Sequence, residues 1–334
     1  MALLEVDDLH IEYRTPGGTV RAVDGASFVV PEGAIVGLVG ESGCGKTTVA
    51  RALTRVMAKN ATISGGRILF AGQDLLTLNN GAMNKLRWRD IAFVPQSAMN
   101  SLDPVYRIET QLAEVLCQRG GMNRAEARKR SEELFDMVGI DPKRLSDFPH
   151  QFSGGMRQRV AIALALALDP KLIIADEPVT ALDVIVQRQI LDQLLDLQKR
   201  LKISVILVTH DISVVAYTCD HVVVMYAGQV IEAGPTEHVL TQPSHPYTMG
   251  LYNAFPDLQA SGGELTPIQG FPPDLRRPPD GCRFAPRCPF AIDACHRQAP
   301  QLQSLASNHR AACLRLGEAS ALRLRAREFE TWCQ

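Results

Sequence analysis

The sequence has almost no net charge. Its 35 Lys and Arg residues almost balance its 36 Asp and Glu residues, which leaves a formal net charge of −1. A protein that attracts nucleic acid or anionic lipid through a general basic field needs an excess of Lys and Arg. The balance of charge therefore argues against nucleic acid as a partner.

The sequence also lacks a secretory signal and a membrane-spanning run. Its first residues, MALLEVDDLHIEY, are acidic and contain neither a basic stretch nor a cleavage site. The longest apolar run, VAIALALAL over 160–168, is about half as long as a bilayer-crossing helix. These absences predict a soluble, intracellular protein. In a reducing cytosol, clustered cysteines favour metal binding or catalysis over disulfides.

The hydrophobic pattern predicts an α/β fold. Apolar runs near 36–39, 172–175 and 205–208 show no in–out alternation, which is typical of strands buried on both faces of a parallel sheet. Helical patterns alternate with the strands, so we expect a mixed sheet. The clearest helical patterns cover 46–57, 156–168 and 184–201. Other strand-like runs cover 3–13, 26–31, 67–72, 91–96 and 221–234.

Changes in hydrophobic pattern and proline content along the chain predict its domains. A mostly helical subdomain is expected at about 97–160, where Asn123 and Glu126 are spaced as a capping box. After about residue 242 the chain becomes rich in proline. We therefore expect one large domain over 1–255. A small, irregular, cysteine-containing C-terminal domain should follow over 256–334, with little apolar core and a terminal helix at 318–332.

Residues 40–48 read GESGCGKTT and fit the pattern G-x-x-x-x-G-K-[ST] between an apolar strand and a helix. Glycines at this spacing let backbone N–H groups curve round a phosphate, and the next helix N-terminus adds a partial positive charge. Lys46 should reach the β- and γ-phosphates, and Thr47 should supply a hydroxyl to Mg²⁺. Cys44 is expected to be a passive small residue. The predicted nucleotide-binding residues here are Gly40, Glu41, Ser42, Gly43, Cys44, Gly45, Lys46, Thr47 and Thr48.

The run LIIADEP over 172–178 is an apolar strand that ends in two carboxylates. Asp176 at the tip of the strand can bind Mg²⁺ directly or through water, and Glu177 can orient and deprotonate the attacking water. An acidic pair alone is weak evidence, because such pairs often cap a turn. Downstream of a phosphate-binding loop, the pair predicts a nucleoside triphosphatase.

A second glycine-rich segment, FSGGMRQR over 152–159, lies between the phosphate-binding loop and the acidic pair. Its small residues precede a helical pattern and so form another anion-binding helix N-terminus. One chain does not need two such sites for one nucleotide. We therefore expect a head-to-tail dimer, in which this segment closes over the γ-phosphate held by the partner. The predicted contact residues are Ser153, Gly154, Gly155 and Met156.

In this order, the motifs resemble those of the ATP-binding cassette (ABC) family, from residue 3 to about 255. The resemblance implies that Tyr13 stacks on adenine, that Asp183 crosses the dimer interface and that His210 contacts the γ-phosphate. Gln96 matches the glutamine that senses Mg²⁺ and the attacking water and that begins the segment contacting a membrane partner. The implied catalytic residues are Glu177, His210 and Gln96, and the implied Mg²⁺ ligands are Thr47, Gln96 and Asp176.

The signature segment departs from the family's common text, LSGGQ, at two positions. Phe152 replaces leucine, and Met156 replaces glutamine. Methionine followed by Arg-Gln-Arg is frequent in one branch of the family, so we do not interpret Met156 as a sign of a degenerate site.

The run SHPYTMGL over 244–251 and the cysteine region beyond it are similar to the C-terminal extension of oligopeptide/dipeptide permease ATP-binding subunits, a group that also serves nickel and other solutes. The resemblance implies that hydrolysis of ATP drives solute uptake. The implied partners are a second ATPase subunit, related to but distinct from this one, two transmembrane permease subunits and an extracytoplasmic solute-binding protein. It implies a peripheral position on the cytoplasmic face of the cell membrane.

Four cysteines of the tail, Cys282, Cys288, Cys295 and Cys313, follow the spacing C-x5-C-x6-C-x17-C. These gaps are wider than those usual in zinc knuckles and suit an iron–sulfur cluster better. The resemblance implies a [4Fe-4S] cluster, with zinc and unligated structural thiols as the alternatives. Cys333 is a weaker candidate for the fourth ligand. We expect ATP binding by residues 1–255 to be independent of this tail.

Two other classes of function remain open. A soluble ABC protein that works on ribosomes or DNA usually has two cassettes or a long coiled-coil insertion, and this chain has neither. A redox- or iron-sensing ATPase would use the metal cluster as its active element and ATP as a regulator. Co-purification with membrane subunits favours transport over sensing. The sequence does not identify the solute, which this subunit does not touch.

Overall fold

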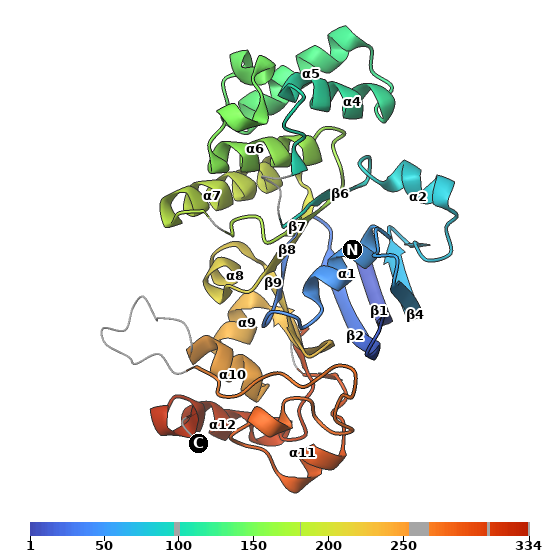
Figure 1. Cartoon of the computed structure of the whole chain (residues 1–334). Coiled ribbons are helices and arrows are strands. Elements are labelled where there is room, and N and C mark those ends of the chain that lie inside the picture. Colours follow the sequence, from blue (N-terminus) through green and yellow to red (C-terminus); the bar gives the residue numbers. More distant parts are fainter. Residues whose placement is uncertain (97–100, 181, 254–266, 306–307, 333–334) are drawn as a thin grey trace. The chain divides into compact units, whose positions relative to one another are not determined.

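The computed structural model describes residues 1–96, 101–180, 182–253, 267–305 and 308–332. The chain forms two compact units, described separately here. Unit 1 comprises Met1, Pro31–Ile35 and Leu75–Val208, and unit 2 comprises Ala2–Val30, Val36–Asp74 and Thr209–Gln334. Figure 1 labels many of their elements. In the described part of the chain, no helix is both long and apolar enough to cross a membrane.

Unit 1 combines parallel strands with helices, among them the longest, α7. Strands β6, β7 and β8 are hydrogen-bonded in that order and are parallel. Every residue of β7 and β8 is buried, as expected for strands covered on both faces. The strands are β6 (Ile91–Val94), β7 (Leu172–Asp176) and β8 (Ser204–Thr209). The helices are α2 (Asn80–Leu86), α4 (Ile108–Gln118), α5 (Arg124–Met137), α6 (Gly154–Ala165) and α7 (Val184–Leu201).

Helix α5 begins with the predicted capping box. The Asn123 side chain accepts hydrogen bonds from the backbone N–H groups of Ala125 and Glu126, and the Glu126 carboxylate accepts one from the backbone N–H of Asn123. These bonds satisfy backbone donors that a helix N-terminus leaves unpaired. Helix α5 lies beside α4 in this unit (Figure 1).

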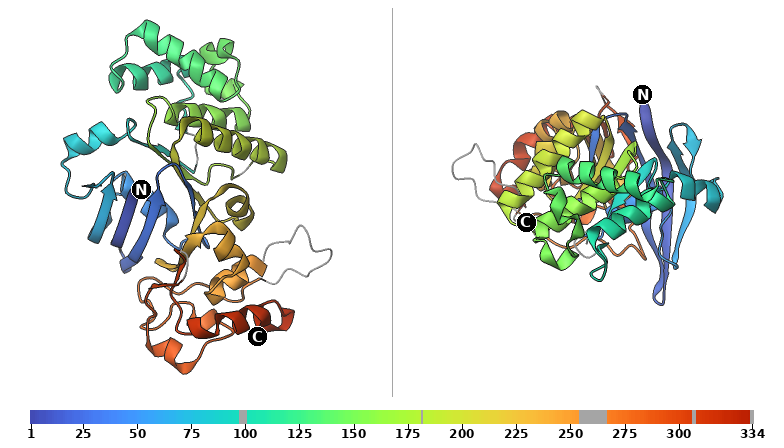
Figure 2. Two further views of the ribbon diagram at one scale, coloured as in Figure 1. Left: turned by 180° about the vertical axis from the view of Figure 1, so that it is seen from behind. Right: turned by 90° about the horizontal axis from the view of Figure 1, so that it is seen from above.

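Unit 2 contains an antiparallel sheet in the order β2-β1-β4-β5. Its strands, blue in both views of Figure 2, are β1 (Ala2–Thr15), β2 (Gly18–Pro31), β4 (Ala61–Phe70) and β5 (Gln73–Asp74). The same unit contains strands in the order β11-β12-β10-β9-β3. They are β3 (Ile35–Val39), β9 (His221–Tyr226), β10 (Gln229–Pro235), β11 (Gln303–Ser304) and β12 (Arg310–Ala311). Because β3 and β9 are parallel whereas β9 and β10 are antiparallel, the predicted mixed α/β fold is confirmed.

The strand-like run predicted at 221–234 is two strands. It folds back on itself between β9 and β10, which pair as an antiparallel hairpin. The turn residues Ala227 and Gly228 have φ values of 47° and 87°. Two residues of positive φ make the tight turn that fits the twist of a hairpin. The hydrophobic pattern continues through this turn, so it did not reveal that the chain reverses direction between β9 and β10.

The helices of unit 2 are short. They are α1 (Lys46–Leu53), α8 (Ile212–Thr218), α9 (Thr236–Thr241), α10 (Pro246–Asn253), α11 (Asp293–Arg297) and α12 (Ala319–Ala326). The terminal helix predicted at 318–332 is shorter than expected, because α12 ends at Ala326 and a separate 3₁₀ turn covers Phe329–Trp332.

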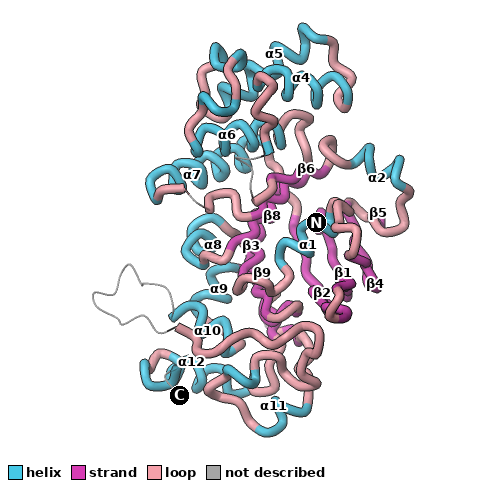
Figure 3. The backbone as a smooth tube through the Cα atoms, viewed as in Figure 1, coloured by secondary structure: helices cyan, strands magenta, loops and turns pink. Residues whose placement is uncertain are grey.

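The tail after α10 is mostly loop, as Figure 3 shows between α10 and α12. Its strand β12 extends the sheet by pairing with β10, so that Ala311 lies opposite Glu232. The tail also has an apolar core, contrary to expectation, with Phe284, Phe290 and Trp332 all buried. The domain boundary predicted near residue 255 falls within 254–266, outside the described residues.

Candidate ATP-binding and catalytic site

The phosphate-binding loop connects β3 to α1 in unit 2 and depends on glycine at two points. Gly40 has a φ of 153°, and a Cβ there would lie 2.1 Å from the carbonyl oxygen of Met225. Gly45, at the start of α1, has a φ of 105°, and its Cβ would lie 2.4 Å from the carbonyl oxygen of Ala22. A side chain at either position would displace backbone, so the loop requires glycine there.

The Lys46 side chain is buried within the loop. Its Nζ donates hydrogen bonds to the carbonyl oxygens of Gly40, at 2.7 Å, and Glu41, at 2.9 Å. It also lies 3.7 Å from the Sγ of Cys44. Burial raises the pKa of the Cys44 thiol, and the positive charge of Lys46 lowers it by less. Cys44 is therefore a buried thiol that stays protonated at neutral pH.

Tyr13 lies beside the helix that follows the loop. Its hydroxyl is 3.3 Å from the Oγ1 of Thr48, so strand β1 and helix α1 are joined at this point. The structure thus brings the predicted adenine-stacking residue next to the predicted phosphate-binding loop. His210 is exposed and also belongs to unit 2, directly after β8.

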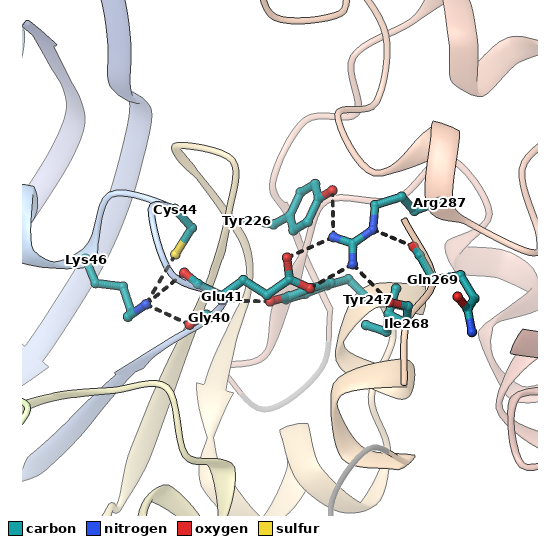
Figure 4. Close-up of polar contacts among 9 residues, drawn as sticks. All are labelled: Gly40, Glu41, Cys44, Lys46, Tyr226, Tyr247, Ile268, Gln269 and Arg287. Carbon is teal, nitrogen blue, oxygen red and sulfur yellow. Dashed lines mark hydrogen bonds and ion pairs between the residues drawn. The ribbon is translucent and has the colours of Figure 1, made fainter. Parts of the chain in front are cut away.

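The phosphate-binding loop contacts the tail, which the sequence did not predict. Arg287 forms a two-point ion pair with the carboxylate of Glu41, and the Tyr247 hydroxyl accepts a hydrogen bond from the backbone N–H of Glu41 (Figure 4). The loop therefore contacts the tail directly, and the expectation that ATP binding by residues 1–255 is independent of the tail stays a prediction. Tyr247 belongs to the HPYT run, the one sequence feature that could have indicated this contact with the loop. Nothing in the sequence pattern singled out Arg287.

The acidic pair lies at the end of β7 in unit 1. Asp176 is buried, and its neighbour Glu177 is partly exposed with a φ of 48°. The Gln96 side-chain amide donates a hydrogen bond of 2.8 Å to the Glu177 carboxylate, and the Thr180 hydroxyl lies 3.2 Å from the same oxygen. Non-glycine residues in this left-handed region cost about 1 kcal/mol or more and are concentrated at functional sites. The structure thus brings together two of the residues predicted to be catalytic.

The signature segment begins α6, where the Ser153 hydroxyl caps the helix by accepting a hydrogen bond from the backbone N–H of Met156. Ser153 is exposed, and Gly154 and Gly155 are partly exposed. A Cβ at Gly155 would lie 2.5 Å from the Cγ1 of Val186, so α7 leaves no room for one.

Arg144 links the two unusual residues of the signature segment. Its guanidinium lies 4.4 Å from the centroid of the Phe152 ring, and it donates a hydrogen bond of 3.2 Å to the Sδ of Met156. The cation–π contact with Phe152 and the soft sulfur acceptor of Met156 thus share one partner. Sequence reasoning did not identify Arg144, which lies in a different segment.

Asp183 caps helix α7. Its side chain accepts a hydrogen bond of 2.9 Å from the backbone N–H of Val186. The next two residues, Val184 and Ile185, are large apolar side chains with exposed fractions of 81% and 72%. An exposed apolar pair beside a cap is the kind of surface that a partner can cover.

The four tail cysteines line one small cavity, together with His245 and Phe290 among others. Burial raises the pKa of Cys288 to about 12 and that of Cys313 to about 11. The described residues nevertheless contain no group of three or more His, Cys, Asp or Glu side chains placed to hold a metal ion. The expected iron–sulfur or zinc site is therefore not confirmed. Cys333 lies outside the described residues.

Comparisons with known proteins agree with this geometry. The profile described as ABC transporter matches residues 23–180, and that described as the oligopeptide/dipeptide transporter C-terminal region matches residues 231–295. The dimeric, ADP- and Pi-bound ATP-binding cassette MJ0796 has a similar structure, with a TM-score of 0.63 and 28% identity over 70% of this chain and 98% of that chain. The structure of CbiO1 from Clostridium perfringens also has a TM-score of 0.63, with 30% identity over 72% of this chain and 91% of that chain.

Curated relatives match almost the whole chain. The dipeptide transport ATP-binding protein DppD of Bacillus subtilis is 45% identical over 314 residues, which are 93% of this chain and 94% of that protein. The oligopeptide transport ATP-binding protein OppD of Salmonella typhimurium is 46% identical over 315 residues, which are 94% of this chain and 93% of that protein. The chain therefore belongs to the ABC transporter family, in its oligopeptide/dipeptide group of ATP-binding subunits, and is an ATPase of that family.

Proposed function

We propose that this chain is the subunit that hydrolyses ATP to drive the uptake of peptides through a membrane permease. The observation that carries the proposal is the pairing of Gln96 with Glu177 at the tip of β7, in a chain that also forms a glycine-dependent phosphate-binding loop. Peptide as the solute is supported by the names of the curated relatives, which transport dipeptides or oligopeptides.

In this proposal, Glu177 is the general base. Its carboxylate orients the attacking water and takes its proton, and the Gln96 amide holds the carboxylate in place through the 2.8 Å hydrogen bond. Lys46, the backbone N–H groups of residues 40–48 and the N-terminus of α1 bind the phosphates. Tyr13 stacks on the adenine, and His210 contacts the γ-phosphate.

The chain offers donors that suit Mg²⁺. Thr47 supplies a hydroxyl, Asp176 a carboxylate and Gln96 an amide oxygen, and hard oxygen ligands of this kind are those that Mg²⁺ takes beside phosphates. Asp176 is 1% exposed at the end of a fully buried strand, which is where a metal-binding carboxylate is held rigidly. When bound, Mg²⁺ would neutralise charge on the phosphates.

The signature segment acts on the nucleotide of a second subunit. Ser153 is exposed at the N-terminus of α6, and the exposed pair Val184 and Ile185 follows Asp183 on α7. Both features suit an interface in which each subunit completes the other's ATP site. A related cassette, MJ0796, is described as dimeric. We propose that the partner here is a related ATPase subunit, giving a heterodimer.

The remaining partners lie at and beyond the membrane. We propose that two transmembrane permease subunits bind this chain near the segment that begins at Gln96, and that an extracytoplasmic solute-binding protein delivers the peptide. The position of the chain is then peripheral, on the cytoplasmic face of the membrane. The absence of a membrane-crossing helix among the described residues is compatible with this position.

We also propose that the four-cysteine cavity receives an iron–sulfur cluster. Burial raises the pKa of Cys282, and backbone hydrogen bonds from Phe284 and Ala285 oppose that rise. The backbone N–H of Arg315 donates a hydrogen bond to the Sγ of Cys313. Hydrogen bonds aimed at sulfur stabilise thiolate ligands.

Deletion of the gene for this chain in its own organism tests the proposal. Uptake of labelled dipeptides and oligopeptides should be lost, and uptake of labelled free amino acids should continue. The wild-type chain should restore peptide uptake, and the Glu177→Gln variant should not. Unchanged peptide uptake together with lost nickel uptake would support the alternative solute. Unchanged uptake of every solute, with redox-dependent ATP hydrolysis by the isolated chain, would support a sensing function.

A further inference from the structure

Arg287 of the tail uses all its hydrogen-bond donors, and two of them bond to Glu41 of the phosphate-binding loop. Its Nη1 donates to Glu41 Oε2 at 2.8 Å and to the Tyr226 hydroxyl at 3.2 Å. Its Nη2 donates to Glu41 Oε1 at 3.0 Å and to the carbonyl oxygen of Ile268 at 3.2 Å, and its Nε donates to that of Gln269 at 2.8 Å. A guanidinium has five N–H donors, so every donor of this arginine side chain has an acceptor (Figure 4).

The residue that Arg287 holds is the second residue of the loop, and its backbone is fixed as well. The Glu41 backbone N–H donates a hydrogen bond of 2.9 Å to the Tyr247 hydroxyl. The Glu41 carbonyl oxygen accepts one of 2.9 Å from the Nζ of Lys46. Side chain, N–H and carbonyl of Glu41 therefore each have a fixed partner, and two of the three partners lie after residue 245.

Arg287 also controls the charge of the loop. The Glu41 carboxylate is a negative charge in a segment whose task is to bind phosphates, and an unpaired carboxylate there would repel them. The Arg287 side chain is only 6% exposed and that of Glu41 27% exposed, so their ion pair is partly shielded from water. A two-point pair of this kind is stronger and more directional than an exposed one.

Neighbouring residues of the tail fix the position of Arg287, so that Arg287 can in turn fix Glu41. Phe284, three residues earlier, packs edge-on against the rings of Tyr226 and Tyr247, with centroid distances of 5.3 Å and 5.4 Å. Arg283 donates hydrogen bonds to the carbonyl oxygen of Ala227 and to Asp24. The two residues directly before the 3₁₀ turn of Ala285–Arg287 are thus held against the core of unit 2.

We propose that Arg287 is a positioning residue for ATP binding: it holds and neutralises Glu41 and so keeps the phosphate-binding loop in the shape that accepts a triphosphate. The proposal rests on the assignment of residues 40–48 to phosphate binding. It makes the tail a part of the ATP site.

A double-mutant cycle on the purified full chain tests this role. Binding of a fluorescent, ribose-labelled ATP is measured for Arg287→Ala, Glu41→Gln and the double variant. Arg287→Ala should raise the Kd about tenfold, which is about 1.4 kcal/mol, because it leaves the Glu41 carboxylate unpaired. The double variant should bind ATP more tightly than Arg287→Ala, because the unpaired carboxylate is gone. In the assembled transporter, Arg287→Ala should raise KM for ATP and change kcat by less than about twofold.

Arg276→Ala is the matched control, since Arg276 is an exposed tail arginine that pairs with Asp274. Wild-type affinity in a folded Arg287→Ala variant, an equal loss in Arg276→Ala or no recovery in the double variant would each overturn the proposal.

If Arg287→Ala does not fold, Arg287→Lys tests the role instead. Lysine keeps the charge but not the planar fork, so weaker ATP binding supports the role of Arg287 and unchanged binding overturns it. Lys46→Ala tests the assignment of residues 40–48 to phosphate binding separately from the role of Arg287. ATP binding that survives this change refutes that assignment.

Discussion

At Glu177, three local features coincide: a carboxylate at the end of a buried strand, a left-handed backbone and a hydrogen bond from Gln96. Replacing the carboxylate by an amide of the same shape keeps the packing and removes the base. Glu177→Gln should therefore retain ATP binding and lower turnover by about 10²- to 10⁴-fold. Single-turnover hydrolysis by the assembled complex measures this, with the exposed Glu114→Gln as the control. Near-normal hydrolysis would remove Glu177 from its role as the base.

Ser153 gives a residue-level test of the partner arrangement. Arginine at this exposed position should leave nucleotide binding by the variant subunit intact, because the serine is assigned to the partner's nucleotide. It should block closure over the partner's γ-phosphate and so stop hydrolysis there. Nucleotide crosslinking in a dimer with one variant subunit distinguishes the two sites, and Ser146→Arg serves as the control. Loss of nucleotide from the variant chain's own loop would contradict the head-to-tail arrangement.

Among the elements, α10 is held at its N-terminus by a buried carboxylate. Glu232 of β10 accepts hydrogen bonds from the backbone N–H groups of Ser244 and His245, and it also bonds to His309 of the tail. A negative charge at a helix N-terminus stabilises the helix. This arrangement places Tyr247, two residues later, where its hydroxyl reaches the phosphate-binding loop. The element therefore connects the sheet, the tail and the ATP site.

His245 makes the stability of this element depend on pH. Complete burial lowers its pKa from 6.5 to about 3, so the folded chain keeps the imidazole neutral while the unfolded chain protonates it below pH 6.5. The stabilising contribution is therefore fully present above pH 6.5 and is lost as the pH falls towards 3. At pH 5 the loss should be about 2 kcal/mol relative to pH 7.

Denaturant unfolding between pH 5 and pH 7 measures this dependence. His245→Asn keeps a hydrogen-bond acceptor for the backbone N–H of Tyr247 and should flatten the curve. The exposed His150→Asn should leave the curve unchanged. An identical pH dependence in wild type and His245→Asn would show that His245 is not the responsible group.

The cysteine-lined cavity is the second testable element. Anaerobically purified protein should be brown and contain iron and acid-labile sulfide in similar amounts. Cys288→Ser should remove the colour, because Cys288 lines the same cavity as the other three tail cysteines. Cys117→Ser, outside the tail, is the control and should keep it. Stoichiometric zinc without sulfide would show that the four cysteines bind zinc and not an iron–sulfur cluster. The absence of any metal would refute both the cluster and the zinc site.

The elements also show how far the sequence could be interpreted. The phosphate-binding loop, the acidic pair and the capping box of α5 were predictable, because each depends on residues close together in the chain. The contact between Glu41 and Arg287 was not, because 246 positions separate the two residues. The hairpin at Ala227–Gly228 was missed because the apolar pattern continues through the turn. The tail's core was missed because a few aromatic rings, rather than a periodic pattern, build it.

At the scale of the whole molecule, both units contribute to one reaction. Unit 1 contains Gln96, the signature segment, Asp176, Glu177 and Asp183, and unit 2 contains the phosphate-binding loop, Tyr13, His210 and the tail. Neither unit alone holds the full set of residues to which the proposed mechanism assigns a role in hydrolysis.

The most direct test of the account measures peptide uptake and ATP hydrolysis in the same proteoliposomes, with the complex purified through a tag on this chain. Labelled oligopeptide should accumulate only with ATP, Mg²⁺ and the solute-binding protein present, and hydrolysis should rise when peptide is supplied. Glu177→Gln should abolish both while the complex still assembles. Accumulation of peptide without ATP, or at the wild-type rate with Glu177→Gln, would contradict the account.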